Sequence, residues 1–451
     1  MTRRKAGASA IMLTTSRFFR FCLSAGLRLG ILVMAATLVP TPATPQPQAP
    51  QPPAAPQGPA PPGGTPQPSG VKAVLSDIEK LFTHKPESFL VQSIVPGGGT
   101  GGGGHYIKDF SRDPWEREFR ATGVATIRAF WMAELQVRLA HDAFSPWHSA
   151  EDKFNMHFFA RARDLPSMAF YGIGTNPYVA PEAFFHQRDT LAGIDATDPL
   201  VSWLAVGGRL EELWPFAEPA GPSVQSIAVL YPGTPGLASQ PAFTHYEFFL
   251  RPRYPARPPF NIDYRISYGY YQDHDTGQFS FRRLTVNAYN NLYPFHNSDG
   301  STNGDKFFTL RGLIIASDAS TGHVVPFYLQ PTLGGTDANN DSTLRGFTDY
   351  QFRGPNAILM QAEYNHRFWK YLGGFVFYDA GKVTLLKSDL NFSGMYQSYG
   401  LGASFWMNGM VLFKVYVGLG SGKGPHPYFG IPNFTGETLV TGRGPAASPW
   451  N

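Results

Sequence analysis

The sequence predicts an all-β fold, a transmembrane antiparallel β-barrel of about 16 strands formed by residues 115–434. Segments of about ten residues alternate apolar and polar side chains and are separated by Gly, Pro, Asn and Asp. This pattern is typical of strands with one face toward lipid and the other toward a lumen. Aromatic residues make up 14% of the chain and flank these segments, as in 268–271 and 368–369. The N-terminus resembles a secretory signal.

The alternation is clearest in the segment 357–368. Its apolar set is Ile358, Met360, Ala362, Tyr364 and Phe368, and its polar set is Gln361, Glu363, Asn365 and Arg367. Successive side chains of a strand point to opposite faces, so one face of the segment is apolar and the other polar. A soluble sandwich would bury the apolar face. The signal sequence, the strand length and the flanking aromatics favour the barrel, which alone leaves no unpaired backbone edge in hydrocarbon.

The N-terminal regions are predicted to be a leader and a spacer. Residues 1–43 are predicted to be a signal peptide, because a basic leader precedes the apolar run 29–39, "LGILVMAATLV", and small residues follow it. The run is too short to span a bilayer, which disfavours a membrane anchor. Residues 44–70 are rich in Pro, Gln and Ala and are predicted to be a disordered spacer.

The two regions that flank the barrel are expected to be minor elements. Residues 71–114 are expected to form a short helix and a Gly-rich connection, since apolar residues recur at helical spacing only over 71–82. The helix either plugs something or has no role. The run 96–106, "PGGGTGGGGHY", has no Gly-Lys-Ser/Thr after it and is not a phosphate-binding loop. Residues 435–451 are expected to be a C-terminal extension.

Composition and motifs disfavour several function classes. The net charge is +4, but the first 70 residues hold six basic and no acidic residues, so the rest is near neutral and predicts no nucleic-acid partner. Cys22 is the only cysteine, and no paired histidine spacing or G-x-S-x-G occurs. We therefore expect no metal, no cofactor and no enzymatic activity. The loops 299–305 and 337–341 resemble the start of a calcium loop but lack its terminal Glu, so solvated turns are expected.

One loop carries a motif that neither an exposed tip nor an apolar core explains. The stretch 341–356, "DSTLRGFTDYQFRGPN", lies between two predicted strands and contains the triplet Arg345-Gly346-Phe347. The next predicted strand supplies Glu363. The strand after it, "GGFVFYDAGKV", forms an F-x-D-x-G motif, whose members are Phe377, Asp379 and Gly381.

These motifs together resemble those of the bacterial surface antigen superfamily, the BamA/TamA-type outer-membrane barrels. Leu344 to Phe347 matches the (V/I/L)RG(F/Y) signature of that family. The resemblance covers roughly residues 330–434 and implies that the loop lies between strands 11 and 12 of sixteen and folds back into the lumen. Five strands should then follow, and five are predicted: 357–368, 371–384, 397–408, 409–419 and 426–434.

We hypothesise that the triplet locks the loop inside the barrel. Arg345 would donate charge-assisted hydrogen bonds to Glu363 and Asp379, which lie on the polar faces of their strands. Gly346 would permit a tight backbone and Phe347 would pack beside it. The alternative is an ordinary extracellular turn, with both acids lining a pore.

The resemblance implies a location in the bacterial outer membrane and a function without covalent chemistry. A lateral seam between the first and last strands would help a protein or lipid enter or cross the membrane. The expected partners are outer-membrane lipids and unfolded outer-membrane or secreted proteins. The family's periplasmic POTRA domains have no room between the predicted signal and first strand, which weakens the insertase expectation. The alternative is a passive pore or structural surface antigen without insertase activity.

Overall fold

The computed structural model describes residues 87–145, 153–174, 180–220, 225–257, 260–337, 341–407, 410–420 and 424–430. The predicted signal peptide, spacer, helix and C-terminal extension all lie outside these residues. Among the described residues, no helix is long and apolar enough to cross a membrane.

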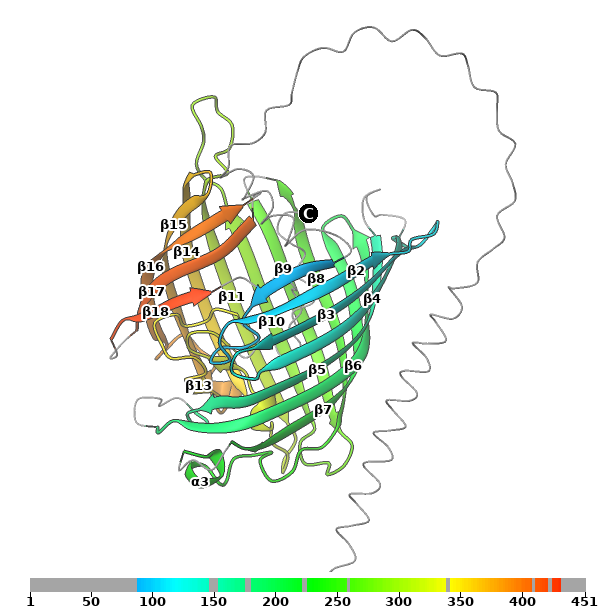
Figure 1. The fold of residues 1–451 in the computed structure, drawn as a ribbon, viewed down its shortest axis with the longest axis vertical. Coiled ribbons are helices and arrows are strands. Elements are labelled where there is room, and N and C mark those ends of the chain that lie inside the picture. Colours follow the sequence, from blue (N-terminus) through cyan, green and yellow to red (C-terminus); the bar gives the residue numbers. More distant parts are fainter. Residues whose placement is uncertain are drawn as a thin grey trace, which may run out of the picture. The chain divides into compact units, whose positions relative to one another are not determined.

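Sixteen strands form one antiparallel sheet that curves into a barrel (Figure 1). Its strands, in order around the wall, are β1 (Glu87–Gln92), β2 (Gly101–Asp109), β3 (Glu116–Thr126), β4 (Trp131–Asp142), β5 (Lys153–Phe170), β6 (Ala183–Val201), β7 (Leu204–Pro219), β8 (Phe243–Arg257), β9 (Phe260–Asp273), β10 (Phe281–Leu292), β11 (Lys306–Ala319), β14 (Asn356–Trp369), β15 (Leu372–Thr384), β16 (Tyr396–Met407), β17 (Met410–Gly420) and β18 (His426–Gly430). Every strand pairs with its neighbour in sequence, and β11 pairs with β14.

The remaining elements are short and lie in the connections. They are α3 (Ile227–Leu230), the 3₁₀ turns η1 (Phe327–Leu329) and η2 (Lys387–Asp389), and the two-residue strands β12 (Thr332–Leu333) and β13 (Phe352–Arg353). Because neighbouring strands are antiparallel, the β1–β2, β11–β14 and β17–β18 connections all lie at the same end of the barrel, which we call the loop end.

The predicted 16-stranded barrel, with a long loop between strands 11 and 12, is confirmed. The predicted start at residue 115 is wrong: β1 and β2 of the described wall precede it, and the Gly-rich run enters β2. A Cβ on Gly103 would lie 2.0 Å from the Gly123 carbonyl oxygen, so the strands approach too closely there for any side chain. Glycines show no alternation, which hides such a strand from pattern analysis.

The predicted faces hold in the wall, with apolar side chains outward and polar side chains inward. On β14, Met360 is 49% exposed and faces outward, whereas Glu363 is 8% exposed and faces inward. On β17, Val415 and Val417 face outward, and Tyr416 is buried. A lipid-facing apolar belt and an enclosed polar interior are the arrangement expected of a transmembrane barrel.

The interior holds its largest apolar clusters where the long loop packs against the wall. At the loop end, buried residues of several strands form a cluster with the segment 325–329 of the long loop. The Phe327 ring lies 5.0 Å from that of Phe185 and 5.6 Å from that of Phe170. A second cluster joins Leu313 and Ile315 of β11 to Phe347 of the loop. The long loop therefore packs on the inner wall at two separate places.

Candidate functional site

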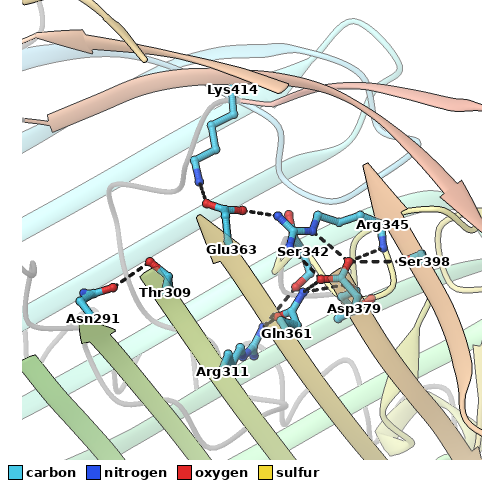
Figure 2. A network of polar contacts seen from close by, with 11 residues as sticks. Asn291, Thr309, Arg311, Ser342, Arg345, Gln361, Glu363, Asp379, Ser398 and Lys414 are labelled. Carbon is cyan, nitrogen blue, oxygen red and sulfur yellow. Dashed lines mark hydrogen bonds and ion pairs between the residues drawn. The ribbon is translucent and has the colours of Figure 1, made fainter. Parts of the chain in front are cut away.

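The structure places the Arg345 side chain inside the barrel, against two acids of neighbouring strands (Figure 2). Its Nε donates to Asp379 Oδ2 at 2.9 Å and one terminal nitrogen donates to Asp379 Oδ1 at 2.7 Å, which is a bidentate pair. The other terminal nitrogen donates to Glu363 Oε2. The Arg345 backbone N–H also donates to Asp379, at 3.1 Å. Bidentate pairs of this kind fix orientation as well as energy.

The two acids are held by further groups of the wall. Lys414 of β17 donates to Glu363 Oε1 at 2.9 Å, so this carboxylate lies between two cations. Asp379 accepts from Ser398 at 3.3 Å and from Gln361 at 3.2 Å. The Asp379 side chain is fully buried, and that of Glu363 is 9% exposed. Charges this deep are tolerated because each is paired and hydrogen-bonded.

Aromatic rings surround the guanidinium. Arg345 Cζ lies 3.7 Å from the centroid of the Phe377 ring, within cation–π distance. The Tyr416 ring packs edge-on against Phe377 at 5.4 Å and stacks on Tyr428 of β18 at 4.6 Å. The predicted Phe377 therefore forms the apolar floor of the site and connects it to the last described strand.

Gly346 lies directly on the backbone of β17. A Cβ at this position would be 2.4 Å from the Gly420 nitrogen, and a Cβ on Gly418 would be 2.3 Å from the Arg345 carbonyl oxygen. Real Cβ atoms do not approach backbone this closely, so the contact requires glycine on both sides. Glycine is required here because the two backbones approach each other closely, and not because either glycine has an unusual backbone angle.

The other two predicted residues pack beside the ion cluster. Phe347 is buried and its ring lies 5.1 Å from Phe352 and 6.0 Å from Tyr396. A Cβ on Gly381 of β15 would lie 3.3 Å from Leu333 of the loop. The structure therefore brings all seven predicted residues into one region.

Several residues of this region carry no signal in the triplet motif. Lys414, Ser398 and the pair Gly418 and Gly420 lie on β16 and β17, far along the chain. The alternation of β17 places Lys414 on the inward face, which is the only sequence signal for it. A second contact that fixes the loop also carries no signal in the motif. Arg353 donates to the Phe327 carbonyl oxygen at 2.7 Å and anchors the segment that packs on β5 and β6.

Asp349 occupies a different part of the loop and caps its turn. Its Oδ1 accepts the Thr336 backbone N–H at 2.8 Å. Burial raises the pKa of the Asp349 carboxyl to about 6, although the Thr336 hydrogen bond opposes this shift. Loop docking is therefore coupled to protonation of this group.

The two Asp-rich loops form turns stabilised by their own side chains. Asp299 accepts the Ser301 N–H at 2.9 Å, and Asn303 accepts the Asp305 N–H at 2.9 Å. Asp337 accepts the Asp341 N–H at 2.9 Å. The two bonds within 299–305 are the expected Asx-turns. The Asp337 bond spans four residues and Asp337 is only 4% exposed, so the expectation of a solvated turn is wrong for 337–341. Within the described parts of the chain, no group of three or more His, Cys, Asp or Glu side chains could hold a metal ion.

Comparisons with known proteins find similarity in structure but not in sequence. No family model matches the chain, and no curated protein matches it. The crystal structure of BamA from Haemophilus ducreyi lacking POTRA domains 1–3 is similar with a TM-score of 0.52 at 12% identity, covering 76% of this chain and 69% of that chain. The chain has a BamA-like β-barrel fold.

Two CdiB structures show weaker similarity to this BamA-like barrel. CdiB from Escherichia coli has a TM-score of 0.49 at 11% identity, covering 76% of this chain and 61% of that chain. CdiB from Acinetobacter baumannii has a TM-score of 0.44 at 12% identity, covering 74% and 55% respectively.

Proposed function

We propose that this BamA-like barrel belongs to the bacterial surface antigen superfamily and acts in the bacterial outer membrane. It would assist a protein or lipid to enter or cross the bilayer through a lateral seam between β1 and β18. Its partners would be membrane lipids and unfolded outer-membrane or secreted proteins. The observation that carries the proposal is the Arg345 guanidinium held on Asp379 and Glu363 inside the lumen.

The strands beside the proposed seam share few residue pairs and few side-chain contacts within the described residues. Up to Gly430, the last described residue, β18 pairs with β17 through five residue pairs, whereas β15 and β16 share ten. Pro427 of β18 has no N–H to donate to a neighbouring strand. On the other side, β1 pairs with the four consecutive glycines 101–104 of β2, which offer no side chains for cross-strand contacts.

The long loop disfavours a passive pore. Its segment 325–329 packs on one side of the barrel interior, and its triplet packs on the other side. A solute that entered at the loop end would have to displace buried aromatic contacts such as Phe327 on Phe185. An insertion factor needs no open lumen, because its substrate would use the seam. The function requires neither a cofactor nor covalent chemistry.

The test is reconstitution of the purified barrel into liposomes. The folding rate of an unfolded outer-membrane protein added to these liposomes is compared with the rate in empty liposomes. The leakage of a trapped small dye is measured in parallel. Faster client folding without leakage supports the proposal. Leakage without faster folding would support the passive pore instead.

A matched pair of variants connects the result to the site. Arg345→Ala removes the cation that joins Asp379 and Glu363, whereas Arg251→Ala removes a bidentate pair between β8 and β9, in which Arg251 contacts Asp263 at 2.9 Å. We expect Arg345→Ala to change the rate of client folding and Arg251→Ala to leave it unchanged. Equal effects of both variants would show that the assay reports general barrel stability.

A further inference from the structure

The long loop contacts both sides of the proposed seam from inside the barrel. On one side it touches β17, the neighbour of the last described strand, and on the other it touches the β1–β2 connection. The two contacts are made by residues only four positions apart, Gly346 and Tyr350.

The contact with β17 is made backbone to backbone. Gly346 lies against Leu419 and Gly420 so closely that a Cβ would approach both within 2.6 Å. On the same strand, three residues before Leu419, Tyr416 stacks on Tyr428 of β18, with the two rings 20° from parallel. A shift of β18 relative to β17 therefore disturbs a stack whose Tyr416 ring lies 6.0 Å from the Arg345 guanidinium carbon of the loop.

The contact with the first hairpin is made by one tyrosine. The Tyr350 hydroxyl donates to the Pro96 carbonyl oxygen at 3.1 Å. The Tyr350 ring is 2% exposed and lies in the same buried cluster as Ile94 and Val95. Ile94, Val95 and Pro96 all belong to the connection that follows β1.

The backbone of Tyr350 shows that these contacts hold it in place. Its φ is +61°, in the left-handed region that bulky residues rarely adopt. Such a conformation persists only where surrounding contacts stabilise it. The ring packing and the Pro96 hydrogen bond are contacts of that kind, and both involve the first hairpin.

We propose that residues 346–350 form an internal strap that holds the two sides of the seam together at the loop end. Four residues of extended chain reach at most about 14 Å, so the two contacts limit how far β17 and the β1–β2 connection can separate. The seam can widen at this end only after the loop leaves one of its two contacts. The role of the strap in insertion rests on the proposed function, whereas its limit on the separation of β17 and the β1–β2 connection does not.

Pulsed electron paramagnetic resonance tests the strap. Nitroxide labels are placed at Ala125→Cys on β3 and Val417→Cys on β17, both exposed positions, in a Cys22→Ser background. The label-to-label distance distribution is measured in proteoliposomes without client. Tyr350→Phe removes the hydroxyl alone and Tyr350→Ala removes hydroxyl and ring. Tyr246→Phe, at an exposed position of the outer wall, is the control.

The strap predicts a graded response. The unmodified loop should give one narrow distance peak. A longer-distance component should appear in Tyr350→Phe and grow in Tyr350→Ala, while Tyr246→Phe matches the parent. An unchanged distribution in Tyr350→Ala, together with faster amide exchange of the loop, would overturn the proposal. Since no client is present, separated labels combined with absent insertion activity would retain the strap and reject the proposed function.

Discussion

Removing the Arg345 side chain should release the long loop from the barrel wall. In Arg345→Ala, the fully buried Asp379 loses the only cation that contacts it among the described residues, whereas Glu363 keeps Lys414 at 2.9 Å. Breaking a buried pair by removing one partner costs about 3–5 kcal/mol. Because Glu363 remains paired, we expect the lower value, about 3 kcal/mol. Each 1.4 kcal/mol is a factor of ten, so the open population of the loop should rise about 100-fold.

Amide hydrogen exchange of the barrel in lipid nanodiscs measures this population. Peptides that cover residues 341–353 should lose about 100-fold protection in Arg345→Ala, while peptides from β5 and β6 keep theirs. Arg251→Ala should leave the loop peptides unchanged, because its pair joins two strands and no loop. Loop protection within about threefold of the parent in Arg345→Ala would refute the reasoning.

Three further predictions follow from close packing, burial and exposure. Gly346→Ala should release the loop, because the new Cβ would lie 2.4 Å from the Gly420 nitrogen. Gly312→Ala should leave the loop in place, because no atom lies within 4 Å of a Cβ there. Equal amide exchange of the loop in both variants would contradict this prediction. The folded pKa of Asp349, about 6, exceeds its ordinary 3.8, so loop protection, corrected for intrinsic exchange, should fall as pH rises from about 4 to 6. Asp349→Asn should abolish that slope, and a persistent slope would assign it to another group. Leu401→Arg places a charge at an outward position that is 66% exposed and should cost about 2–4 kcal/mol if it lies near the bilayer midplane; an unchanged unfolding midpoint in urea would show that Leu401 does not face lipid.

The period-two pattern predicted the strands after the loop to within a few residues. Segments 357–368 and 371–384 became β14 and β15. Each of these strands has one face toward lipid and one toward the interior, so side-chain chemistry records the fold directly. The resemblance of the Arg345 triplet to a family signature added the position of the loop, which periodicity does not contain.

The elements that the sequence did not predict are those formed by backbone contacts or by packing between residues far apart in the chain. The glycines of β2 pair normally but present no side chains, so the first hairpin shows no alternation. The segment around Phe327 resembles an ordinary apolar loop, and only the folded barrel places it against Phe185. Gly418 and Gly420 pack against Arg345 and Gly346 across more than 70 positions of sequence. Contacts of this kind depend on tertiary structure and leave no local pattern.

A double-mutant cycle between Arg345 and Asp379 tests the central claim most directly. Loop protection is measured by amide exchange in the parent, Arg345→Ala, Asp379→Ala and the double variant, and the coupling free energy is calculated from the four values. A bidentate, fully buried contact predicts a coupling of about 2 kcal/mol or more. A coupling near zero, with additive effects of the two substitutions, would show that this ion pair does not hold the loop in the barrel.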